Sequence, residues 1–102
     1  MNIESASKGF AAAGAMPRLG VLVKLVRMGP QGMTVGALQE SLEIPASTLA
    51  HHLRYLLDAG LIEQKKIGRQ VINVANFEQL QALADFFLDQ CCVDSDMEST
   101  CC

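Results

Sequence analysis

The sequence predicts a mainly α-helical domain that carries one β-hairpin, a small α+β fold. Two observations lead to this prediction. Residues 34–61 contain two short runs in which apolar side chains recur at helical spacing. Residues 61–75 follow directly and contain two β-prone runs around a connection with a glycine. The length of 102 residues fits a single domain with one small core.

Residues 34–61 are expected to form two helices joined by a tight turn. Thr34 can cap the first helix, because its hydroxyl can accept a hydrogen bond from an otherwise unpaired backbone N–H. Pro45 cannot continue that helix, but it suits the first turn of the next one. Gly60 is the expected stop of the second helix. The buried stripe of this second helix is predicted to be Leu49, Leu53 and Leu56.

Residues 61–66 and 71–75 are expected to be antiparallel strands, joined by residues 67–70. Basic side chains gather at the tip of this hairpin: Lys65, Lys66 and Arg69. A helix-turn-helix followed at once by a basic hairpin is the arrangement of a winged helix, in which the second helix enters the major groove and the hairpin meets phosphates. The predicted DNA contacts of the second helix are Ser47, Thr48, His51, His52 and Arg54.

Three further helices complete the expected fold. The first spans the alanine-rich residues 3–14, in which Ile3, Phe10 and Ala13 are spaced like one helix face. The second runs from about residue 17 to 28 and is apolar enough to be the central core helix, with Arg18 as a solvated charge. The third begins after Asn76 as its cap and extends to about residue 90.

The first and last helices carry more apolar surface than one small domain can cover. A two-fold homodimer through these two helices would bury that surface. Residues 1–92 are therefore expected to form a DNA-binding and dimerisation domain, and residues 93–102 a flexible tail that bears cysteines. A dimer presents two recognition helices, so the expected partner is pseudo-palindromic double-stranded operator DNA with half-sites roughly 34–36 Å apart or a multiple of that.

The charge distribution agrees with DNA binding better than the net charge of −3 does. Residues 47–72 contain four basic side chains against two acidic ones, whereas residues 76–102 contain six acidic and no basic side chains. The positive charge thus lies on the winged-helix segment. No segment is long and apolar enough to span a membrane, so a cytoplasmic, reducing location without a membrane partner is expected.

Residues 29–92 resemble the ArsR/SmtB family of small metalloid- and metal-responsive winged-helix repressors. The resemblance rests on the letters TLAHHL at residues 48–53 and AGLI at residues 59–62, followed by the hairpin. It implies a dimer of the same fold through the outer helices. Two features depart from the family pattern. Ala50 stands where members often carry Ser, and the first helix of the motif lacks the cysteines that form the family's thiol pair there.

All four cysteines lie in the last twelve residues, as two adjacent pairs: Cys91, Cys92, Cys101 and Cys102. A disulfide framework would instead spread its cysteines to staple a core. Soft thiolates select thiophilic ions, and no histidine follows His52 to complete a mixed zinc site. Adjacent cysteines on a helix point about 100° apart, so a third sulfur must come from the tail of the same or the partner chain. Three sulfurs suit trivalent arsenic or antimony, and the resemblance agrees, because arsenic-responsive members often end in a helix with a Cys-Cys pair.

The predicted function is that of a homodimeric transcriptional repressor, not an enzyme. The operator is released when trivalent arsenic, as arsenite or an organoarsenical, or antimonite binds the C-terminal cysteines. A catalytic thiol is not predicted, because acidic side chains surround these cysteines and no Cys-X-X-Cys motif is present. Two alternatives stay open. One is a repressor of the same fold that senses peroxide or persulfide through its thiols, and the other is a winged-helix module for protein interaction.

Overall fold

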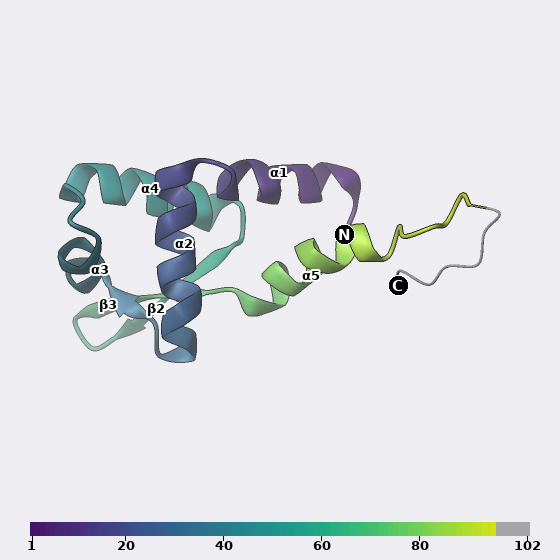
Figure 1. The fold of residues 1–102 in the computed structure, drawn as a ribbon. Helices are drawn as coiled ribbons and strands as arrows, with labels where there is room; N and C mark the ends of the chain where they lie inside the picture. The colour runs from purple at the N-terminus through teal and green to yellow at the C-terminus, as the bar shows by residue number, and fades with distance from the viewer. Residues whose placement is uncertain (96–102) are drawn as a thin grey trace.

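The computed structural model describes residues 1–95, which form five α-helices and a small three-stranded antiparallel sheet (Figure 1). The helices are α1 (Ile3–Ala13), α2 (Met16–Met28), α3 (Val35–Leu42), α4 (Ala46–Asp58) and α5 (Phe77–Leu88). The strands are β1 (Met33–Thr34), β2 (Ile62–Ile67) and β3 (Gln70–Ala75), in the order β1-β3-β2, and a short 3-10 turn, η1 (Gly29–Gln31), joins α2 to β1. The predicted winged helix-turn-helix is confirmed.

The core lies between α2, the α3–α4 pair and the sheet. Leu25 of α2 and Leu38 of α3 are fully buried, and the predicted stripe of α4 is confirmed, because Leu49, Leu53 and Leu56 are at most 4% exposed. Burial of such side chains is the main source of stability in a domain of this size. Within the described residues, no single helix meets the length and hydropathy of a membrane span; only α1 and Met16–Gln31 together do, as a pair bent by 96°.

The helix ends follow the predicted capping residues. The Thr34 hydroxyl accepts a hydrogen bond from the Ala37 N–H at 3.1 Å. The Asn76 side-chain oxygen likewise accepts from the Gln79 N–H at 3.2 Å. Pro45 lies one position earlier than predicted, in extended conformation immediately before α4. The two caps explain why α3 and α5 begin where they do.

The inward face of α1 consists of small residues. Ala6, Gly9 and Ala12 are buried, whereas Ile3 is 76% exposed. The reason is a close approach to α5: a Cβ added at Gly9 would lie 2.9 Å from a methyl carbon of Leu83. Small residues must therefore face the domain, and the large apolar residues of α1 face outward.

The hairpin is longer and its turn tighter than predicted. The expected connection of residues 67–70 shrinks to Gly68 and Arg69, because Ile67 pairs with Gln70 at the end of the ladder. Gly68 has a φ of +63°, which suits a two-residue hairpin with glycine at the first central position. The strand β1 was not predicted. Its two residues are extended because they pair with Asn73 and Ile72 of β3.

Candidate DNA-binding surface and thiol site

Four of the five side chains predicted to contact DNA from α4 lie on its exposed face. They are Ser47, Thr48, His51 and Arg54. Ser47, His51 and Arg54 are spaced by four and three residues, so they form one stripe along the helix. The buried leucines on the opposite side hold this stripe toward solvent. Hydroxyl, imidazole and guanidinium groups at such positions can bond to base edges and phosphates.

His52 differs from its neighbour, because its ring turns partly into the protein. The residue is half-buried, and its Nδ1 atom is buried without a hydrogen-bond partner among the described residues. Burial lowers the pKa of His52, and the positive charges of Arg18 and His51 lower it further. The ring is therefore mostly neutral near pH 7. Its contact with DNA stays a prediction that this placement does not favour.

The three basic residues predicted at the hairpin tip are all exposed. Lys65 pairs with Ile72 and Lys66 pairs with Val71, so the two lysines point to opposite faces of the hairpin. Lys66 shares its face with Gln64, which lines a groove of about 350 Å³ together with Arg54 of α4. Arg69 lies in the turn itself. The hairpin thus offers positive charge on both faces and at its end.

A buried asparagine, which sequence reasoning missed, supports this groove. Asn73 is fully buried in β3. Its side-chain oxygen accepts from Gln64 Nε2 at 3.0 Å, and its Nδ2 donates to the backbone oxygen of Met33 at 3.3 Å. The signal in the sequence was a single amide within the apolar run of residues 71–75, because a buried amide needs partners. These bonds fix the orientation of Gln64 beside α4.

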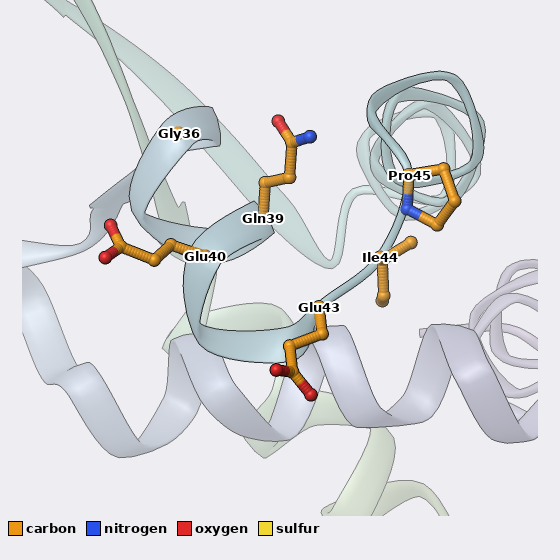
Figure 2. Close-up of a pocket in the computed structure, with 6 residues that line it drawn as sticks. All are labelled: Gly36, Gln39, Glu40, Glu43, Ile44 and Pro45. Atoms are coloured by element: carbon orange, nitrogen blue, oxygen red, sulfur yellow. The ribbon is translucent and has the colours of Figure 1, made fainter.

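Acidic side chains limit the DNA-facing surface on the α3 side. A hollow of about 490 Å³ lies at the turn between α3 and α4. Figure 2 shows the six residues that line it: Gly36, Gln39, Glu40, Glu43, Ile44 and Pro45. Glu40 and Glu43 are both exposed there. Their carboxylates repel phosphates, so favourable contacts with the DNA backbone are expected from α4 and the hairpin rather than from this turn.

The described cysteines lie beyond α5, which ends at Leu88, two residues earlier than predicted. The Sγ atoms of Cys91 and Cys92 are 3.7 Å apart. Cys92 has a φ of +61°, so the pair does not follow helical geometry and the expected divergence of about 100° does not apply. The two sulfurs are therefore close enough to act on one centre.

The structure leaves the third sulfur undetermined. Cys101 and Cys102 lie outside the described residues. Cys91 is disulfide-bonded, so its sulfur would act as a thiolate ligand only after reduction. Among residues 1–95, no three His, Cys, Asp or Glu side chains are grouped as a metal site. The four-cysteine site consequently stays a prediction.

Comparison with known proteins finds one domain model that matches part of the chain and several solved structures of similar fold. A model described as "Helix-turn-helix domain" matches residues 18–65. No curated protein sequence matches the chain. Among solved structures, an ArsR-like transcriptional regulator from Rhodococcus sp. RHA1 is 25% identical over 85% of this chain and 79% of that chain, with a TM-score of 0.77. A possible transcriptional regulator for arsenical resistance is 27% identical over 88% of this chain and 98% of that chain, with a TM-score of 0.63.

A third structure shares the fold. It is the homodimeric winged helix-turn-helix DNA-binding domain of a possible ArsR-family regulator from Mycobacterium bovis, 22% identical over 94% of this chain and 84% of that chain, with a TM-score of 0.69. Together these likenesses show the winged helix-turn-helix fold.

Asn76 joins the last helix, α5, to the end of α4. Besides capping α5, its Nδ2 donates to the backbone oxygen of Gly60 at 3.0 Å. Its backbone N–H donates to the backbone oxygen of Leu61 at 2.9 Å. One residue thus holds two consecutive carbonyls that follow the recognition helix. A movement of the start of α5 would therefore displace the residues that follow α4.

The two roles of the Asn76 side chain can be separated by substitution. Asn76→Asp keeps an oxygen that caps α5 but loses the donor to Gly60, so we expect a loss of about 1 kcal/mol in the free energy of unfolding. Asn76→Ala loses both functions, and we expect about 2 kcal/mol. Urea unfolding followed by circular dichroism measures both values. Equal losses in the two variants would contradict separate capping and bridging roles.

Proposed function

We propose that the chain is a homodimeric transcriptional repressor that binds operator DNA through α4 and the β2–β3 hairpin. We further propose that trivalent arsenic or antimony releases the operator by binding Cys91 and Cys92 together with Cys101, Cys102 or both. The observation that carries the DNA-binding part is the exposed stripe of α4 beside a hairpin with exposed Lys65, Lys66 and Arg69. A helix and a basic hairpin in this arrangement can contact bases and phosphates together.

The outer surface of α1 and α5 supports the dimer. Phe10 and Phe87 contact each other with ring centroids 5.1 Å apart, and Phe87 remains 65% exposed. Ile3 of α1, Leu88 of α5 and Val93, which follows α5, are further exposed apolar side chains. Apolar surface of this kind is typical of an interface, and the Mycobacterium bovis domain with the same fold is described as homodimeric. A second copy of the chain would cover it.

The neighbouring sulfurs after α5 support the choice of effector. Once the disulfide at Cys91 is reduced, Cys91 and Cys92 would supply two soft ligands just beyond α5, a helix that belongs to the proposed dimer interface. A similar protein is described as a possible transcriptional regulator for arsenical resistance, which supports arsenic as the effector. Ligation would draw the end of α5 toward the tail, and a shift of α5 would change the relative placement of the two recognition helices.

The salt dependence of DNA binding tests the role of the hairpin. Duplexes are first selected from a random-sequence pool with the native protein. Replacing Lys65, Lys66 and Arg69 by glutamine is expected to lower the slope of log affinity against log salt by about 2.7, because about three phosphate contacts are lost. Lys8→Gln, on the exposed face of α1, is the matched control and should leave the slope unchanged. An unchanged slope in the triple variant would exclude the hairpin from phosphate binding.

Effector titrations test the coupling. Because the two binding events are linked, DNA must weaken arsenic binding by the same factor as arsenic weakens DNA binding. Arsenite, antimonite, methylarsenite, cadmium and zinc are titrated into free and operator-bound protein. We expect different arsenite affinities in the two states, and equal affinities would exclude the mechanism. Failure of the native chain to select any duplex would favour the protein-interaction module.

A thiol-redox repressor is the second candidate, and the disulfide at Cys91 favours it. In that case an oxidant, not a metalloid, would change the end of α5. Operator release by peroxide or persulfide, with no release by arsenite under reducing conditions, would select this candidate over the first.

A further inference from the structure

Arg18 lies at the corner between α1 and α2, and its side chain bonds back to α1. Its Nε donates to the backbone oxygen of Ala12, and its Nη2 donates to the backbone oxygen of Ala11 at 3.1 Å. These carbonyls belong to the last turn of α1, where carbonyls lack helical partners and carry partial negative charge. Arg18 is therefore not the solvated charge that the sequence predicted. It closes the C-terminal end of α1.

The same guanidinium also contacts the recognition helix. Its Cζ lies 4.4 Å from the ring centroid of Tyr55 in α4, a cation–π contact. The Tyr55 ring in turn meets the His51 ring edge-on, with centroids 5.0 Å apart. His51 is exposed on the stripe predicted to face DNA. A series of direct contacts thus leads from the end of α1 to the DNA-facing side of α4.

The contact between Arg18 and Tyr55 lies where side chains of α1 and α4 do not pack closely against each other. A surface hollow of about 410 Å³ lies there, lined by Lys8, Ala11, Ala12, Arg18, Tyr55, Asp58 and Ala59. Arg18 is half-buried, and two of its N–H groups already serve carbonyl oxygens. It is accordingly better placed to hold α4 against α1 than to bind a phosphate itself.

We propose that Arg18 is a positioning residue for operator recognition, acting through Tyr55. It fixes the direction of α4 relative to α1. Because α1 belongs to the proposed dimer interface, this direction sets the separation of the two recognition helices and therefore the half-site spacing that the dimer accepts. The inference rests on the proposed function, and its test has one arm that needs no DNA.

The first arm uses Tyr55, the only tyrosine in a chain without tryptophan. Arg18→Lys keeps the positive charge but loses the planar, multiply donating guanidinium. We expect the NMR signals of the Tyr55 ring protons and of the His51 ring to shift. Arg27→Lys makes the same replacement at an exposed position of α2 and should leave both unchanged. Unchanged Tyr55 signals in Arg18→Lys would overturn the inference.

The second arm uses duplexes selected by the native protein, rebuilt with half-site separations that differ by single base pairs. Arg18→Lys and Tyr55→Leu should each lose roughly tenfold in affinity for the best spacing, the size expected when a cation–π contact and a hydrogen bond are lost. Both variants should accept neighbouring spacings more readily, whereas non-specific DNA binding should stay unchanged. Tyr55→Phe keeps the ring and should behave as the native chain.

Two outcomes separate this inference from the proposed function. If the native chain selects duplexes and Arg18→Lys keeps its spacing preference, only the role of Arg18 is overturned. If Arg18→Lys loses the same affinity for selected and for non-specific DNA, the positioning role is also overturned, and Arg18 contacts a phosphate instead. If the native chain selects no duplex, the proposed function itself fails.

Discussion

The variant with Cys91→Ser and Cys92→Ser is expected to bind its operator as the native chain does and to remain bound when arsenite is added. Serine has nearly the same size as cysteine but is a hard oxygen ligand, so thiophilic arsenic loses two of its sulfurs. Because α4 and the hairpin are untouched, DNA affinity without effector should not change. The coupling between arsenite and DNA should fall from the usual range, about 5- to 150-fold, to none.

Fluorescence anisotropy of labelled operator DNA, recorded with and without arsenite, measures this coupling. The matched control is Asp89→Asn with Asp94→Asn, which alters two exposed neighbours of the same turn but no sulfur. That control should still release DNA. Cys101→Ser and Cys102→Ser, made separately, would identify the third ligand. Arsenite-dependent release by a chain without any cysteine would refute the arsenic mechanism.

Gly32→Ala is expected to destabilise the domain more than any other single change considered for this chain. Gly32 has φ +64° and ψ −165°, a region that essentially only glycine adopts. A Cβ there would clash with the backbone oxygen of Asn73 and would lie 2.7 Å from a methyl carbon of Val74. Strain and overlap together should cost about 4 kcal/mol, which is much of the stability of a typical small domain.

Gly20→Ala is the matched control, because it makes the same chemical change inside α2. A Cβ at Gly20 meets nothing within 4 Å. Alanine is the better helix former, so this variant should gain about 0.5–1 kcal/mol. Thermal and urea unfolding of both variants measure the two effects. A Gly32→Ala variant as stable as the native chain would show that β1 can move away from β3 at little cost.

The sequence was sufficient wherever structure follows from neighbours along the chain. The spacing of Leu49, Leu53 and Leu56 identified the recognition helix and its buried side, because helical periodicity is a local property. Thr34 and Asn76 located the starts of two helices, since a capping side chain bonds only three residues ahead. The same local rules located the hairpin and its basic tip. They also placed Ser47, Thr48, His51 and Arg54 on one exposed helix.

Contacts between distant segments could not be read in this way. The large residues of α1 face outward because Leu83, more than seventy positions after Gly9, leaves no room for them. Arg18 links α1 to α4, because it bonds to the end of α1 and contacts the ring of Tyr55. Asn73 is buried because β1 joins the sheet.

The pair Cys91 and Cys92 depends on both local chemistry and tertiary structure. The prediction of soft-ligand chemistry rests on the sulfur atoms themselves and stays a prediction. The geometry of the pair depends on where α5 stops, and α5 stops at Leu88 rather than near residue 90. The tertiary structure therefore decided that the two sulfurs lie side by side, because the backbone at Cys92 leaves the helical conformation.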